Sequence, residues 1–206
     1  MTVDRSALRG SLRKSLRKNR RALSARHQIA ASTKLYQQVL RQPYFHAARH
    51  IAFYLPVDGE IDPSRLLRRA LQERKICYLP VIRPRSDSME FIRFDAQDTL
   101  QRNRWGIRQP RLNLRKRIAP WALDLVFVPL AGFDSACARL GMGKGFYDRA
   151  FHFRRKGGRR RPLLVGLAHE CQRHDFLPTE SWDIRMDIVI TDQAVYEASQ
   201  DDSATD

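Results

Sequence analysis

The stretch RLGMGKGFYDR, residues 139–149, holds the residue types that bind a phosphate group. Its three glycines lack a Cβ atom and can adopt positive φ, so backbone N–H groups can converge on one anion. Lys144 adds a point charge for a phosphate oxygen, and Asp148 offers a carboxylate to Mg²⁺. The stretch therefore predicts a phosphate-binding loop, with an ordinary flexible turn as the alternative.

The familiar nucleotide-binding motifs do not describe this loop. A P-loop requires a glycine five residues before the Gly-Lys pair and a Ser or Thr after the lysine, but Ala138 and Gly145 stand there. The dinucleotide-binding fingerprint requires a third glycine where Phe146 stands. A phosphate bound here would thus be held by a loop of another kind.

Positive charge is concentrated in two segments. The 206-residue chain has a formal net charge of +16, yet residues 1–23 hold eight basic side chains against Asp4 alone, and residues 154–161 hold six with no acid. In the rest of the chain the numbers of basic and acidic residues are nearly equal. A nucleic-acid-binding protein that uses these two segments is therefore the main alternative function.

The first basic segment has a helical period. An apolar stripe is formed by Leu8, Leu12 and Leu16. A basic row beside it is formed by Arg9, Arg13 and Arg17. Residues four apart lie on one helix face, so a helix laid on the protein body would present the guanidinium groups to one surface. Two interpretations stay open at this point, a solvated face and an anion-binding face.

The elements that must position these residues alternate along the chain. Apolar runs predict strands over 50–56, 76–82, 89–94, 123–130, 162–168 and 187–191. Helical patterns cover 24–41, with Ser24 as N-cap, and 62–75, and another helix begins at GFYDRAFHF. This order predicts an α/β fold, a three-layer sandwich with a mainly parallel or mixed central sheet flanked by helices. We expect one catalytic domain over 1–196 with a basic N-terminal helix, and a disordered acidic tail over 197–206.

The carboxyl ends of parallel strands are where such sheets place their sites. Segments at three predicted strand ends are rich in polar residues: VDGEID, the glycine stretch, and the neighbourhood of Asp187 and Asp192. We expect these segments to meet in one cleft.

Cysteine content and hydropathy indicate the cellular compartment of the protein. The three cysteines are widely spaced and form no C-x-x-C pair, which argues against a disulfide framework. No apolar run approaches the ~20 residues that span a bilayer. A cytoplasmic protein is predicted, without a membrane partner and monomeric by default.

The motifs together resemble one family. PLAGFDSACARLGMGKGFYDRAF is similar to the signature of the 5-formyltetrahydrofolate cyclo-ligase family. Further family segments follow the family order: LRGSLRKSLRKNRRALS, IAFYLPVDGEID, WGIRQP and LPTESWDIRMDIVIT. The resemblance runs from about residue 8 to residue 192.

The resemblance implies an ATP- and Mg²⁺-dependent ring closure. In this reaction 5-formyltetrahydrofolate becomes 5,10-methenyltetrahydrofolate, and ADP and phosphate are released. The γ-phosphoryl group is transferred to the formyl oxygen, and N10 then attacks the activated carbon. Catalysis of this kind consists mostly of positioning and charge neutralisation.

The resemblance also implies residue roles. Catalytic roles fall to Lys144, Arg139 and Tyr147. ATP contacts fall to Arg9, Arg13, Arg139, Leu140, Gly141, Met142, Gly143, Lys144, Gly145, Phe146 and Tyr147. Folate contacts fall to Leu55, Glu60, Trp105 and the segment Met142, Gly143, Lys144, Gly145, Phe146. Metal ligands are Asp148 and Asp187. Phe146 departs from the tyrosine that the family usually has, and the basic run at 154–161 exceeds the family pattern. That run either attracts the polyglutamate tail of folates or is a solvated loop.

Overall fold

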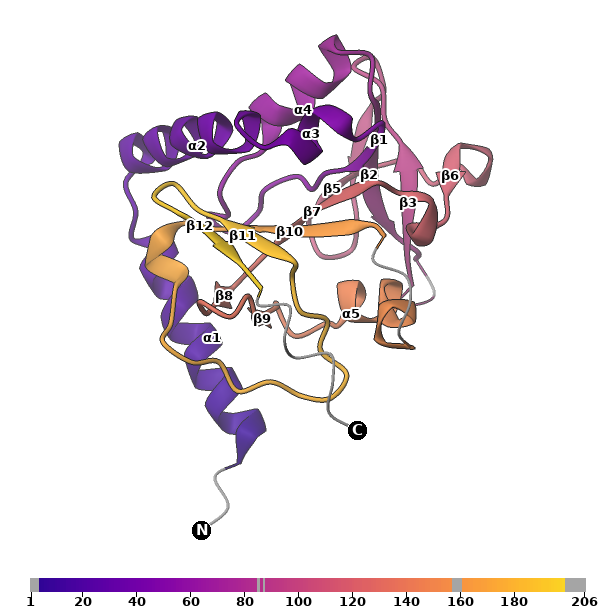
Figure 1. Ribbon diagram of the computed structural model, residues 1–206. Helices are drawn as coiled ribbons and strands as arrows, with labels where there is room; N and C mark the ends of the chain where they lie inside the picture. Colours follow the sequence, from indigo (N-terminus) through magenta and orange to yellow (C-terminus); the bar gives the residue numbers. More distant parts are fainter. Residues whose placement is uncertain (1–3, 85, 87, 157–160, 199–206) are drawn as a thin grey trace.

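The computed structural model describes residues 4–84, 86, 88–156 and 161–198 (Figure 1). The α-helices are α1 Arg5–Arg21, α2 Ala25–Leu40, α3 Pro43–Ala47, α4 Ser64–Gln72 and α5 Phe146–Ala150. Short 3-10 turns are η1 Leu114–Lys116, η2 Pro120–Ala122, η3 His152–Lys156 and η4 Glu170–Gln172. Part of the basic run predicted at 154–161 and most of the tail predicted at 197–206 lie outside the described residues.

An eight-stranded sheet forms the centre of the protein. Its spatial order is β12 Val195–Glu197, β11 Ile188–Ile190, β10 Leu163–Leu167, β7 Leu125–Pro129, β1 His50–Ala52, β2 Ile76–Ile82, β3 Met89–Arg93 and β6 Arg117–Ile118. The five strands from β11 to β2 are parallel, and β12, β3 and β6 are antiparallel to their neighbours. The sheet is therefore mixed, as predicted.

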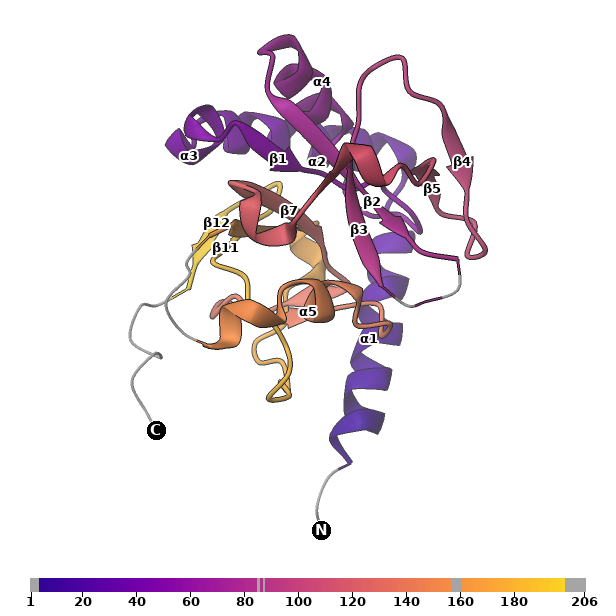
Figure 2. The ribbon, with the colours of Figure 1, turned by 90° about the vertical axis from the view of Figure 1, so that its right-hand side faces the viewer.

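Two layers of helices and loops cover this sheet (Figure 2). In β7, Leu125 and Phe127 face the core under α2, α3 and α4, whereas Val126 and Val128 face the core that α5 closes. A strand buried on both faces has no polar face, which explains the continuous apolar run. The three-layer architecture is confirmed, with α1 packed across one end of the second layer (Figure 1).

Local signals explain the helix starts. The Ser24 hydroxyl accepts a hydrogen bond from His27 N at 3.3 Å and caps α2 as predicted. An Asp62 carboxylate oxygen accepts from Ser64 N at 2.8 Å, where α4 begins. At the other end of the chain, β12 includes Glu197, one residue into the tail predicted from its composition.

Several short strands escaped prediction from the sequence. The hairpin of β4 Leu100–Arg102 and β5 Arg108–Pro110 surrounds the WGI segment, and β8 Gly132–Phe133 pairs with β9 Arg139–Leu140, the first two residues of the glycine stretch. The strand predicted at 50–56 ends at Ala52, because the chain then leaves the sheet toward a turn at 57–60.

Gly166 in β10 supports a prediction about packing. A Cβ atom at this position would lie 2.9 Å from Leu130 Cδ1 and 3.2 Å from side-chain atoms of Met186 and Val189, all three of which are buried. Gly166→Ala is therefore expected to lower the free energy of unfolding by about 1–3 kcal/mol, measured by urea denaturation. Gly10→Ala is the control, because nothing lies within 4 Å of a Cβ there. Equal urea midpoints for the two variants would contradict the packing argument.

Candidate active site

A cleft of about 1760 Å³ opens beside the ends of β1 and β7. Its walls come from α1, the segment after β1, the β4–β5 hairpin, the glycine loop at 141–147 and the segment 180–183. Drug-sized ligands usually occupy pockets of about 300–1,000 Å³. The cleft therefore has room for two ligands of that size at once.

The basic row of α1 faces this cleft. Leu16 is buried against Leu140 and Leu177, and this contact turns Arg9, Arg13 and Arg17 toward the cavity. The row is half-buried at the cleft wall, and anion binding by it stays a prediction.

Each arginine of the row has a different partner. Arg9 forms an ion pair with the Asp183 carboxylate and donates to the Pro178 carbonyl at 2.8 Å. Arg13 Nε donates to the Gly141 carbonyl at 2.8 Å, so α1 is bonded directly to the glycine loop. Burial, followed by the charges of Arg9 and Arg17, lowers the pKa of Arg13. Mutually repelling cations at a cavity wall favour binding of an anion.

The glycine loop follows β9 and leads into α5. Gly143 has φ +91° and Gly145 φ +63°, the left-handed conformation that only glycine adopts at little cost. Gly141, which could also adopt positive φ, does not. Among the residues that the structure describes, none pairs with the exposed Lys144 ammonium, which lines the cleft. The loop therefore offers a cation to a ligand.

Arg139 lies buried beneath the loop. Its guanidinium forms an ion pair with Asp148 and lies 5.9 Å from the Tyr147 ring centroid. The same Asp148 oxygen, Oδ1, accepts a hydrogen bond from Ile184 N at 3.1 Å. Burial raises the pKa of Tyr147, so its hydroxyl stays protonated. Arg139, Tyr147 and Asp148, three of the predicted catalytic and metal-binding residues of this segment, thus form one connected group.

Asp187 lies apart from that group. Its carboxylate accepts from Arg154 at 2.7 Å and from Leu164 N at 2.7 Å, and it does not line the cleft. Asp187 directly precedes β11, so it lies at the amino end of that strand, whereas parallel sheets gather their sites at the carboxyl ends. The expected meeting of three segments is therefore observed for two of them, and metal binding by Asp187 stays a prediction.

The opposite wall carries the predicted folate contacts. Leu55, Glu60 and Trp105 all line the cleft. Asn103 Oδ1 accepts from Trp105 N and Ile107 N at 3.0 Å each and so shapes the turn of the β4–β5 hairpin. The Trp105 ring then meets the Phe146 ring edge-to-face, with centroids 5.6 Å apart. The hairpin and the glycine loop are in direct contact.

Glu60 is a buried acid at this wall, 8% exposed. Its Oε2 accepts from Val57 N at 3.1 Å, across a turn in which Asp58 and Gly59 have φ of +56° and +77°. Burial raises the pKa of Glu60 to about 7, against the opposing effect of the Arg20 charge. A cleft-lining carboxyl that titrates near neutrality is typical of a functional group.

Comparison with known proteins identifies the family. The model of the 5-formyltetrahydrofolate cyclo-ligase family matches residues 5–192. The chain belongs to this family. The cyclo-ligase of Haemophilus influenzae is 36% identical over 185 residues, which cover 88% of this chain and 97% of the relative. That of Escherichia coli K12 is 34% identical over 187 residues, covering 88% and 99%.

The fold agrees with a solved structure of this enzyme type. The solution structure of 5,10-methenyltetrahydrofolate synthetase from Aquifex aeolicus aligns with a TM-score of 0.80 and 30% identity, over 97% of this chain and 96% of the other. This chain is accordingly a cyclo-ligase, an enzyme of folate one-carbon metabolism. Within the described residues, no helix combines the length and apolar character that a bilayer crossing requires.

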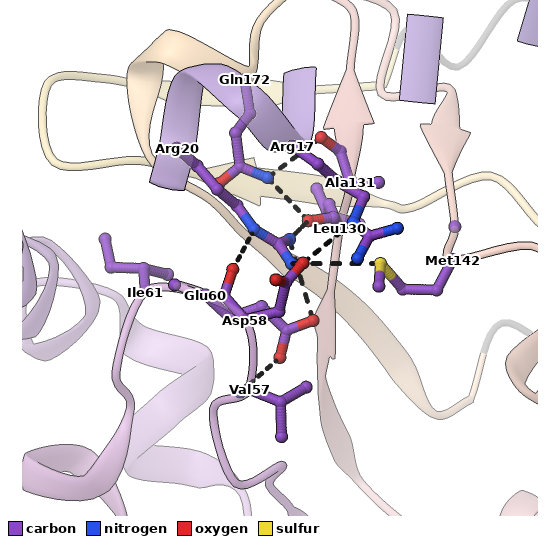
Figure 3. Close-up of polar contacts among 12 residues, drawn as sticks. Arg17, Arg20, Val57, Asp58, Glu60, Ile61, Leu130, Ala131, Met142 and Gln172 are labelled. Atoms are coloured by element: carbon purple, nitrogen blue, oxygen red, sulfur yellow. Dashed lines mark hydrogen bonds and ion pairs between the residues drawn. The ribbon is translucent and has the colours of Figure 1, made fainter. Parts of the chain in front are cut away.

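The structure adds cyclo-ligase residues that sequence reasoning missed. Asp58 accepts from Arg17, Arg20 and Arg21 of α1, and Figure 3 shows Arg17 and Arg20 beside Asp58 at the turn that carries Glu60. Arg20 continues the Leu8, Leu12, Leu16 stripe at the next i+4 position. A charged residue at an apolar stripe position is the signal that could have revealed it.

Proposed function

We propose that this cyclo-ligase converts 5-formyltetrahydrofolate to 5,10-methenyltetrahydrofolate and consumes ATP, with release of ADP and phosphate. The observation that carries the proposal is the shared cleft. A buried carboxyl at Glu60 and the cations at Arg13 and Lys144 line one cavity of about 1760 Å³. Two substrates that exchange a phosphoryl group must lie side by side in such a cavity.

The ATP phosphates are assigned to the gap between α1 and the glycine loop. Arg13 uses its Nε for the Gly141 carbonyl, which leaves both terminal nitrogens directed past Gly143, where a Cβ atom would lie 3.5 Å from Arg13 Cζ. Lys144 supplies a second cation from the loop. Arg9 acts from further along α1, held there by Asp183.

The pterin is assigned to the wall that holds Glu60, Leu55 and Trp105. Its ring N–H and neighbouring amino group are adjacent donors, which a carboxylate can accept with two oxygens. Leu55 and the Trp105 ring supply apolar surface for the flat ring system. The formyl group then faces residues 142–146, between the two substrates.

The chemistry follows from the poor electrophilicity of an N-formyl group. The formyl oxygen attacks the γ-phosphorus, the bond from that phosphorus to the ADP oxygen breaks, and an iminium phosphate forms. N10 attacks the activated carbon, its N–H proton is lost, and the C–O bond breaks to release phosphate. Lys144 and Arg13 offset the charge on the transferring phosphoryl oxygens, and Arg139 holds the segment that carries Tyr147.

Mg²⁺ fits one carboxylate of this site. Asp148 Oδ1 is engaged by Arg139 and Ile184 N, whereas Oδ2 has no hydrogen-bonding partner within the described part of the chain. Mg²⁺ commonly uses one or two carboxylates together with substrate phosphates. When bound, the ion would neutralise charge on the β- and γ-phosphates. Asp187, paired with Arg154, is not needed for this assignment.

A spectrophotometric assay tests the proposal. Purified protein mixed with 5-formyltetrahydrofolate, ATP and Mg²⁺ is expected to produce the absorbance of 5,10-methenyltetrahydrofolate, and omission of ATP or addition of EDTA is expected to abolish it. Folded protein that forms no product would overturn the proposal. The nucleic-acid alternative instead predicts tight binding to a DNA duplex with a steep dependence on salt.

A further inference from the structure

Arg20 is a fully buried charged residue, with 0% of its side chain exposed. It lies near the end of α1, on the helix face that Leu16 also buries. Burying a guanidinium costs several kcal/mol unless its donors are satisfied. Its partners therefore show what the residue holds in place.

Three short hydrogen bonds fix the guanidinium. Nε donates to the Asp58 carbonyl at 2.9 Å and Nη2 donates to the Asp58 carboxylate at 2.8 Å. Nη1 donates to the Leu130 carbonyl at 3.0 Å, directly after β7. Gln172 Nε2 donates to that same carbonyl at 2.6 Å and to Ala131 O at 3.2 Å (Figure 3). One side chain thus joins α1, the turn after β1 and the end of β7.

The same guanidinium reaches both walls of the cleft. Nη1 lies 3.8 Å from Glu60 Oε1, on the folate wall. Nη2 lies 3.9 Å from Met142 Sδ, on the glycine loop (Figure 3). Arg20 does not line the cleft, so it touches these groups from behind.

We propose that Arg20 is a positioning residue for folate binding, which holds the Glu60 carboxylate toward the cleft and ties its turn to the glycine loop. This inference rests on the proposed function of Glu60. It gives α1 a second task beyond the ATP contacts, because one helix then orders both substrate walls.

The effect of the Arg20 charge on the ionisation of Glu60 is the part of this role that can be measured. The groups that face Glu60 are Arg20 and Arg17 from α1, Asp58 from its own turn, Tyr54 after β1 and Tyr147 from α5. The Arg20 charge lowers the pKa of Glu60, and the Asp58 charge raises it. Both tyrosines have a pKa raised by burial and stay neutral. The ionised fraction of Glu60 near pH 7 therefore depends on the Arg20–Asp58 pair.

Two substitutions are expected to move the pH profile in opposite directions. If ionised Glu60 binds the pterin, kcat/KM for 5-formyltetrahydrofolate rises with pH through about 7. Arg20→Met removes the stabilising cation and is expected to move that midpoint upward by about one pH unit. Asp58→Asn removes the competing anion and is expected to move it downward. Asparagine also tolerates the φ of +56° at this position.

Further variants separate positioning from simple loss of structure. Arg20→Lys keeps the charge but cannot make all the bonds, so the midpoint is expected to stay near that of the parent protein while KM for folate rises several-fold. Arg21→Met is the matched control, because Arg21 also contacts Asp58 but is 54% exposed. Its profile is expected to be unchanged, since an exposed charge is screened by solvent. KM for ATP, circular dichroism and thermal denaturation are recorded for every variant.

A direct titration keeps this inference separate from the proposed function. The Glu60 carboxyl carbon, labelled with ¹³C and followed by NMR in ligand-free protein, is expected to show the same opposite shifts. If the parent protein makes no product, the proposed function fails, yet the titration still tests the Arg20 contact. If Arg20→Met does not fold, the Asp58→Asn and Arg20→Lys variants test the inference in its place. An unshifted Glu60 titration in folded Asp58→Asn protein, or a shift in the same direction for both charge removals, would overturn the inference.

Discussion

Lys144→Ala is expected to lower kcat for methenyltetrahydrofolate formation about 100- to 1,000-fold, the usual loss when one donor that stabilises charge in a transition state is removed. The Lys144 side chain is exposed in the cleft, and no residue in the described part of the structure pairs with it. Its removal leaves no buried group unsatisfied, so the fold is expected to stay unchanged. Steady-state rates with saturating ATP and folate measure the effect.

The control for this variant is Lys14→Ala on α1. It changes the net charge by the same amount, and Lys14 is exposed outside the cleft. A full rate is expected for Lys14→Ala, and Lys144→Arg is expected to recover part of the lost rate because it keeps the charge. An unaltered kcat in folded Lys144→Ala protein would remove Lys144 from the proposed mechanism.

Glu60→Gln is expected to lower kcat/KM for 5-formyltetrahydrofolate about 10- to 100-fold while KM for ATP stays the same. Hydrogen bonds to a charged group contribute about 1.5–3 kcal/mol, and an amide presents one donor where the pterin requires two acceptors. The substitution also removes the group whose pKa is about 7. The rise of kcat/KM between pH 6 and pH 8 is therefore expected to disappear in this variant.

Asp62→Asn is the matched acid-to-amide control, two residues further along the chain. The Asp62 side chain is exposed and accepts a hydrogen bond from Ser64 N, a role that asparagine performs equally well. Parent-like kinetics are expected. A Glu60→Gln variant that retains the pH dependence would show that another group titrates near neutrality in the cleft.

The sheet and the main helices could be predicted because their patterns are local. The run LVFVP, residues 125–129, is apolar at every position, as a strand buried on both faces requires, and Ser24 marks the start of α2. The missed strands β4, β5, β8 and β9 have two or three residues each, too few to show an alternating pattern. They pair across short loops, but the contact that holds the β4–β5 hairpin on the sheet is distant in sequence: the Gln109 side-chain oxygen accepts from Ile82 N at 3.1 Å.

Part of the candidate site could likewise be predicted from the sequence, and part could not. The loop at 139–148 and Glu60 could be found from residue type, spacing and family resemblance, because both are short contiguous signals. The segment of Asp187 was expected in the cleft on a strand-end argument, and its metal role was implied by the family resemblance, but Asp187 begins its strand and pairs with Arg154. The predicted strand over 187–191 already began at Asp187, and the apolar pattern alone does not show which loops meet in the cleft, because that depends on the order of the strands in the sheet.

The sequence by itself determined the family, the mixed α/β architecture and the loop that carries Lys144, because these follow from local composition and ordered motifs. Only the tertiary structure decided which charges face the cleft and which lie behind it. Arg13 and Arg20 occur on one basic helix, yet Arg13 lines the cavity and Arg20 is fully buried beneath it. The physical reason is that burial, and the pairing of Arg20 with Asp58 and Glu60, arise only when α1, β1 and β7 meet.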